Sequence, residues 1–149
     1  MNIRISAEPI DGNALKRELA DPHCGGFVAF EGWVRNHHEG RAVERLEYEA
    51  YAPLALREGE LVVAEAKAQF DIRQALCVHR TGLLELSDMA VWVGVAAAHR
   101  DAAFGACRYI IDEVKLRLPI WKKEYYRDGS QAWVNCAHCV RAGPSAAQG

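Results

Sequence analysis

Hydrophobic residues recur along this chain with two different periods, and the two kinds of segment are interleaved. Alternating or continuously apolar runs predict strands around Ile3 and Ile5 and at residues 27–35, 43–51, 75–80, 83–86, 89–97, 120–126 and 131–135. Apolar residues spaced three or four apart predict helices from Asp11 through Leu19, from Pro53 to about Phe70, and from Arg100 to Leu118. Strand pairs and helices therefore alternate, which predicts an α+β fold with mostly antiparallel sheet.

Polar residues, glycines and prolines mark the boundaries of these segments. Asp11 is a plausible N-cap, Pro53 suits a first helical turn, and Pro119 must end the last helix. Residues 36–40 are expected to form a polar loop, and residues 127–130 the turn of a hairpin. These boundaries leave no linker between two domains, so we predict one domain over residues 1–140 and a disordered tail over 141–149.

Composition restricts the class of partner. Half of the 149 residues are hydrophobic, 26% are charged, and the formal net charge is −2. This balance is typical of a globular protein and argues against nucleic acid as a partner. The longest nearly uncharged apolar stretch, residues 89–98, is too short to span a bilayer, and no signal peptide is evident. We expect a cytoplasmic protein whose anionic ligands bind to a local cluster of basic residues.

The last predicted helix carries the first candidate, Lys115. An apolar stripe is expected to face the core, made of Phe104, Cys107, Ile111, Val114 and Leu118. Lys115 borders this stripe, and Arg108 lies two turns earlier on the same edge. We expect Lys115 to be half-sheltered, where a lysine can serve in proton transfer. A snorkelling lysine paired with Asp112 is the alternative.

Lys122 is the second candidate, because Pro119 turns the chain from the helix into an extended segment. A lysine at a helix end and one on the following strand can converge on a single pocket, with Trp121 packed beneath them. The alternative is that Lys122 and Lys123 only belong to a solvated edge strand.

Two further basic positions favour anion binding. His99 and Arg100 follow a strand directly and begin a helix, where free N–H groups and the helix dipole attract phosphate or carboxylate. The alternative is a structural histidine, with Asp101 as the N-cap. Arg35 lies where a strand enters a loop, and Gly32 before it allows a backbone or a ligand to approach closely. The alternative is that Arg35 is a surface arginine in a polar loop.

No metal site is expected. His37 and His38 are adjacent, so on a strand their side chains point to opposite sides. Cys136 and Cys139 form a C-x-x-C pair, but the sequence shows no second pair of zinc ligands, and only His23 with Cys24 could supply one by accident of folding. A thiol or zinc enzyme built on Cys136 and Cys139 remains an alternative.

Taken together, four segments resemble the large, catalytic subunit of molybdopterin synthase. They are Gly-Trp-Val-Arg-Asn-His from Gly32, Val-His-Arg-Thr-Gly from Val78, Gly-Val-Ala-Ala-Ala-His-Arg from Gly94, and Val-Lys-Leu-Arg-Leu-Pro-Ile-Trp-Lys-Lys-Glu from Val114. Each motif is weak alone, whereas four in the family's order are specific, and together they cover Gly26 to about Val134.

The resemblance implies an α/β hammerhead-like domain with an added antiparallel subdomain, and a homodimer without a resident cofactor. A small ubiquitin-like carrier would dock on each protomer and give a heterotetramer. The carrier's C-terminal Gly-Gly thiocarboxylate would donate sulfur to cyclic pyranopterin monophosphate, and two transfers would yield molybdopterin. A non-catalytic module that binds a carrier's tail is the other alternative.

The resemblance also assigns roles to residues. Lys115 and Lys122 match the family's catalytic lysines. Arg35, His99 and Arg100 match positions that bind the phosphate and the pterin, and the His-Arg pair reaches across the dimer. Two further residues fall on positions lining the same pocket, Phe30 and Glu124.

Overall fold

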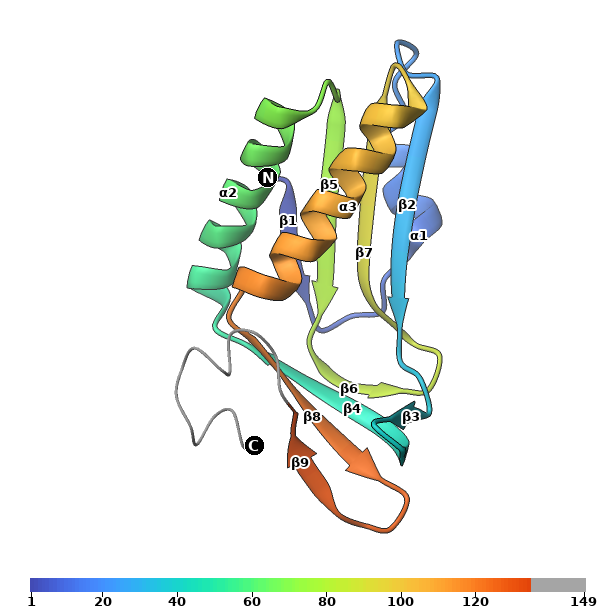
Figure 1. Ribbon diagram of the computed structural model, residues 1–149, viewed down its shortest axis with the longest axis vertical. Helices are drawn as coiled ribbons and strands as arrows, with labels where there is room; N and C mark the ends of the chain where they lie inside the picture. The colour runs from blue at the N-terminus through green and yellow to red at the C-terminus, as the bar shows by residue number, and fades with distance from the viewer. Residues whose placement is uncertain (135–149) are drawn as a thin grey trace.

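A computed structural model describes residues 1–134 and shows a four-stranded sheet with a second sheet at one end (Figure 1). The strands of the first sheet, in spatial order, are β1 (Ile3–Ser6), β5 (Gln74–Arg80), β7 (Met89–Ala97) and β2 (Gly26–Trp33). β1 runs parallel to β5, and the other neighbours are antiparallel. The sheet is therefore mostly antiparallel, as predicted.

Helices cover both faces of this sheet. In Figure 1, α2 (Ala52–Gln69) and α3 (Arg100–Arg117) lie in front of it, and α1 (Gly12–Glu18) lies behind. Alternation along β5 sends Ala75 and Cys77 into the larger core, while Leu76 and Val78 pack in the cluster around α1. β5 and β7 are buried along nearly their whole length because both of their faces are covered.

The second sheet holds β3 (His37–His38), β4 (Arg41–Ala50), β8 (Ile120–Tyr126) and β9 (Gln131–Trp133), with β6 (Gly82–Glu85) also paired to β4. All of its pairings are antiparallel. In this register Tyr48 lies opposite Lys122, and Leu46 lies opposite Glu124. Residues opposite each other share a face, so this sheet brings two candidate residues together with two apolar ones.

The predicted α+β class and the added antiparallel sheet are confirmed, but the predicted loop at residues 36–40 is wrong at His37 and His38. His37 and His38 form β3 and pair with Arg41 and Ala42. The backbone φ angles of the two residues between them are +49° at Glu39 and +79° at Gly40. Two successive positive φ angles are typical of the tight hairpin turn, which allows the polar segment to fold back on itself.

The predicted core stripe of α3 is wrong at one position. Phe104 is 61% exposed, and Ala103 is fully buried in its place. Ala103 and Ala106 face the sheet, so the start of α3 lies close to β7 and β2 with small side chains between them. The other four predicted members of the stripe are buried.

Some predictions fall on residues that the structure does not describe. The tail at 141–149 and the Cys136–Cys139 pair lie outside residues 1–134. Within the described part of the chain, no helix combines the length and the apolar character needed to cross a membrane.

Candidate active site

A cavity of about 470 Å³ opens where the two sheets and the end of α3 meet. Five of the seven predicted site residues line it, namely Phe30, Arg35, Lys115, Lys122 and Glu124. They come from β2 and the residues after it, from α3 and from β8, and thus from three separate segments of the chain. We refer to this space as the lysine cavity.

Strand alternation explains how β8 contributes to the lysine cavity. Lys122 and Glu124 are two residues apart and project from the same face of the strand, whereas Lys123 projects from the other. The Lys123 ammonium instead lies 5.6 Å from the Trp133 ring centroid and 5.4 Å from that of Tyr125. The two adjacent lysines therefore have different surroundings, and of the two only Lys122 lines the cavity.

Lys115 reaches the lysine cavity from the last turn of α3. It is exposed, so the predicted half-sheltered position is wrong. Its Nζ lies 5.7 Å from the centroid of the Tyr48 ring, within the range of a cation–π interaction. Trp121, which we expected beneath the lysines, is not a lining residue of the cavity, because it precedes Lys122 on the strand and projects from the opposite face. Tyr48 provides the aromatic surface instead.

Glu124 is the buried acid of the lysine cavity, with only 2% of its surface exposed. Its Oε1 lies 3.1 Å from Nδ1 of His38 and accepts a hydrogen bond of 2.9 Å from the Tyr126 hydroxyl. Burial, together with this hydrogen bond, raises the pKa of Tyr126, which therefore remains a phenol and a donor. Two neighbours thus hold a carboxylate that is adjacent to two lysines.

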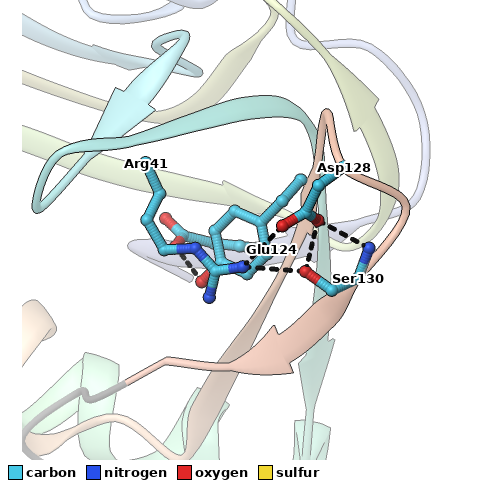
Figure 2. A network of polar contacts seen from close by, with 5 residues as sticks. Arg41, Glu124, Asp128 and Ser130 are labelled. Atoms are coloured by element: carbon cyan, nitrogen blue, oxygen red, sulfur yellow. Dashed lines mark hydrogen bonds and ion pairs between the residues drawn. The ribbon is translucent and has the colours of Figure 1, made fainter.

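A polar network behind Glu124 ties the hairpins together (Figure 2). The Arg41 guanidinium stacks 3.5 Å from the centroid of the Tyr126 ring. It also donates hydrogen bonds to the Ser130 hydroxyl at 2.7 Å and to Asp128 at 3.4 Å. The Asp128 carboxylate in turn accepts from the Ser130 backbone N–H at 2.8 Å. The β3–β4 and β8–β9 hairpins are therefore joined around the residues that hold Glu124.

His79 lies buried beneath Tyr48, and sequence reasoning did not identify it as part of the site. The two ring centroids are 4.9 Å apart in an edge-to-face arrangement. Burial and, to a lesser extent, the nearby charge of Lys115 lower the pKa of His79 to about 3. Burial and, to a lesser extent, the Glu124 charge raise the pKa of Tyr48 to about 12. Both rings are therefore uncharged at neutral pH. The only available signal was the motif Val-His-Arg-Thr-Gly.

Gly32 on β2 is closely approached by a neighbouring side chain, not by the backbone or ligand that the sequence predicted. A Cβ at this position would lie 2.7 Å from Cγ1 of Val91, which is closer than real Cβ contacts. The register of β2 against β7 shifts directly after it, between Gly32 and Trp33. This irregularity ends the regular pairing of the strand shortly before Arg35, which lines the lysine cavity.

His99 and Arg100 lie elsewhere, in a second cavity of about 470 Å³ that we call the helix-start cavity. His99 is the N-cap of α3 and Asp101 lies in its first turn, so the alternative in which Asp101 caps the helix is wrong. α3 has 18 residues and is therefore about 27 Å long. Lys115 lies in its last turn, so the structure does not bring the His-Arg pair and the lysines together within one protomer.

The described cysteines are poor nucleophiles. Burial raises the pKa of Cys77 to about 12 and of Cys107 to about 11. Burial and the Asp21 charge also raise the pKa of Cys24. A thiol reacts as its thiolate, so none of these three favours thiol chemistry at neutral pH. Among residues 1–134 no group of three His, Cys, Asp or Glu side chains is placed to hold a metal ion, which leaves His23 and Cys24 without a third ligand there.

Comparisons of the sequence and of the structure with known proteins find relatives of the same kind. Residues 5–117 match the family model described as MoaE protein. The chain is 40% identical over 131 residues to the molybdopterin synthase catalytic subunit of Thermoplasma volcanium, covering 88% of this chain and 96% of that one. It superposes on molybdopterin synthase from Staphylococcus aureus with a TM-score of 0.85 and 34% identity, covering 91% and 98% of the two chains.

A more distant structure shares the fold. It is the protein–protein complex of subunits 1 and 2 of molybdopterin-converting factor from Helicobacter pylori, matched with a TM-score of 0.75 and 19% identity over 91% of each chain. The family match covers most of the chain and agrees with the resemblance carried by the four motifs. The chain therefore belongs to the MoaE protein family.

Proposed function

We propose that this protein is the catalytic subunit of a molybdopterin synthase and inserts sulfur into a cyclic pyranopterin monophosphate. The observation that carries the proposal is the lysine cavity, which gathers Lys115, Lys122 and Arg35 around a buried carboxylate. Its relatives in Thermoplasma volcanium and Staphylococcus aureus carry the name molybdopterin synthase. Such a chain would act in molybdenum cofactor biosynthesis as a sulfur-group transferase.

The chemistry of the lysine cavity suits two anionic reactants. The substrate is a cyclic phosphate, and the sulfur donor is a C-terminal thiocarboxylate. Lys115 and Lys122 can bind both anions and stabilise the oxyanion that forms when water adds to the acyl carbon, before the C–S bond breaks and leaves the carrier with a carboxylate. A lysine amine can also move protons at the carbon that receives sulfur. Arg35 adds a planar guanidinium suited to phosphate, and Phe30 an apolar surface for the pterin ring.

The helix-start cavity supports a homodimer in which each active site is shared. The His-Arg pair and the lysines lie near opposite ends of α3, too far apart to grip one small pterin. A second copy can bring its own helix start to the lysine cavity. We propose that His99 and Arg100 of one protomer bind the substrate's anionic group beside Lys115 and Lys122 of the other.

The sulfur donor in this proposal is a small ubiquitin-like carrier with a C-terminal Gly-Gly thiocarboxylate, and two carriers with two copies of this chain form a heterotetramer. The complex of two subunits in the Helicobacter pylori converting factor supports such a partner. The described cysteines have raised pKa values, which supports delivery of sulfur by the partner rather than by a thiol of this chain. We place this reaction in the cytoplasm.

The deciding experiment mixes the purified protein with cyclic pyranopterin monophosphate and a thiocarboxylated carrier, and assays molybdopterin. Formation of molybdopterin, with loss of thiocarboxylate from the carrier, is expected. A carrier with a C-terminal carboxylate serves as the control and should give no product. Stable binding of the carrier's tail without product would favour the non-catalytic module instead.

A further inference from the structure

A stack of three side chains passes from the core to the lysine cavity. His79 is 2% exposed and Tyr48 is 7% exposed, and Lys115 lies at the cavity surface. Tyr48 lines the cavity, with the Lys115 ammonium 5.7 Å from its ring centroid and the His79 ring 4.9 Å away on the buried side. We propose that Tyr48 and His79 are positioning residues, which hold the Lys115 amine in place for sulfur transfer.

The backbone fixes the His79 end of the stack. Nδ1 of His79 lies 2.9 Å from the carbonyl oxygen of Arg80, and because a carbonyl can only accept, Nδ1 carries the proton. The ring is thereby anchored to its own strand. Its low pKa, about 3, means that it stays neutral and does not compete with Lys115 for the negative face of Tyr48.

The sheet register explains why Tyr48 needs this support. Tyr48 pairs with Lys122 on β8 and with Gly82 on β6. Gly82 has no side chain, so the β6 position directly opposite Tyr48 places nothing beside the ring, and a ring contact comes instead from His79 on β5. Edge-to-face packing fixes the plane of the Tyr48 ring. The plane of the ring in turn determines where a cation is best stabilised above it.

The test measures the reactivity of the Lys115 amine and requires neither substrate nor carrier. Each folded variant is acetylated briefly with an N-hydroxysuccinimide ester of acetate, and the rate at Lys115 is read by peptide mass spectrometry. Lys67, which is exposed on α2, serves as the internal reference. Because the contact with the Tyr48 ring restrains and shields the end of the Lys115 side chain, Tyr48→Leu should accelerate acetylation of Lys115 about threefold relative to Lys67.

Matched variants separate positioning from loss of packing. Tyr48→Phe retains the ring and should keep the wild-type labelling ratio, while His79→Leu should raise it about twofold because the Tyr48 ring loses its lateral support. Val78→Ala changes the opposite face of the same strand, lowers Tm through lost packing and should leave the ratio unchanged. Should His79→Leu fail to fold, the Tyr48→Leu and Tyr48→Phe pair decides the result. An unchanged ratio in folded Tyr48→Leu overturns the proposal, and so does a changed ratio in Val78→Ala.

The catalytic meaning of this stack rests on the proposed function, and a second readout keeps the two apart. In the molybdopterin assay, Tyr48→Leu should lower kcat about tenfold with KM for the carrier changed less than twofold, because only the placement of the amine changes. If Tyr48→Leu changes the labelling of Lys115 but leaves kcat unchanged, the placement of Lys115 by Tyr48 does not matter for turnover, and that part of the proposal is overturned. Absence of product from the wild-type protein would overturn the proposed function and leave the labelling result standing.

Discussion

The two cavities at the ends of α3 have equal volumes but different construction. The lysine cavity has walls from both sheets and from α3, and it encloses a carboxylate held by His38 and Tyr126. The helix-start cavity is formed by residues 98–101 with Gly25 and Phe104, and Phe104 is 61% exposed. The first cavity therefore has charged groups held in place by neighbouring side chains, whereas the second has a basic pair beside an exposed aromatic ring. In the proposed function, the lysine cavity would carry out the chemistry and bind substrate, whereas the helix-start cavity would only add anion-binding groups.

The largest effect is expected at the lysine cavity. Lys115→Ala and Lys122→Ala should each lower kcat by about a hundredfold or more, because each removes a group that stabilises charge or moves a proton. Lys123→Ala is the matched control, since Lys123 is adjacent to Lys122 but projects from the opposite face of β8. Rapid single-turnover measurements check the expectation. Near-normal rates in both lysine variants would remove the reaction from this cavity.

The next largest effect on activity is expected from an active site that is shared between two protomers. Arg100→Ala and Lys115→Ala proteins should each be nearly inactive alone. After subunit exchange at equal amounts, half of the dimers are mixed, and each mixed dimer has one intact site of two, so about a quarter of wild-type activity should return. Native mass spectrometry verifies the mixed dimers. If verified mixed dimers regain nothing, the two cavities do not form one site.

Arg35 tests whether the lysine cavity also binds the phosphate. Arg35→Lys keeps the charge but loses the two-pronged guanidinium, so affinity for the pterin precursor should fall about tenfold, and Arg35→Ala should lose more. Calorimetric titration of the precursor gives the affinities. Arg108→Lys is the control, because Arg108 is an exposed residue paired with Asp112 at 3.0 Å. Unchanged affinity in both Arg35 variants would assign the phosphate to the helix-start cavity alone.

Acid should destabilise the protein through His79. Its pKa is about 3 in the folded state and near the ordinary value of 6.5 in the unfolded chain. Between those values the unfolded chain binds a proton that the folded protein does not, so the free energy of unfolding falls as pH decreases from 6.5 towards 3. One proton corresponds to a slope of about 1.4 kcal/mol per pH unit. Urea unfolding of the wild type and of His79→Leu should show a shallower dependence in the variant, and parallel curves would contradict the shift.

The smallest effect is expected from the cysteines. A variant with all five replaced by alanine or serine should keep sulfur insertion, because in the proposed reaction sulfur arrives on the carrier. Cys77 and Cys107 are buried, so alanine there should lower Tm through lost packing without removing activity. Abolished turnover in folded Cys136→Ser or Cys139→Ser protein would favour the thiol enzyme instead.

The sequence predicted the positions of helices and strands better than it predicted the burial and contacts of individual side chains. Proline and glycine signals located the end of α3 and most turns, because these residues restrict the backbone locally. Whether Phe104 faces the core or the solvent depends on how closely α3 approaches the sheet. The spacing of apolar residues along a helix does not predict that distance. The contacts of Glu124 with His38, and of Tyr48 with His79, join residues distant along the chain. They follow from strand register, and one sequence alone does not specify which strands pair.

The pairing of β4 with β8 has a consequence for how the protein folds. It places Tyr48 opposite Lys122, so the lysine cavity needs a contact between residues far apart in the chain. Contacts of this kind carry a high loop-closure cost and form slowly. On the ribosome, β4 emerges long before its partner, whereas α2, β5 and β7 can already assemble. The lysine cavity is thus completed only when the last strands are added, and a nascent chain that stops short of β8 lacks two of its lining residues, Lys122 and Glu124.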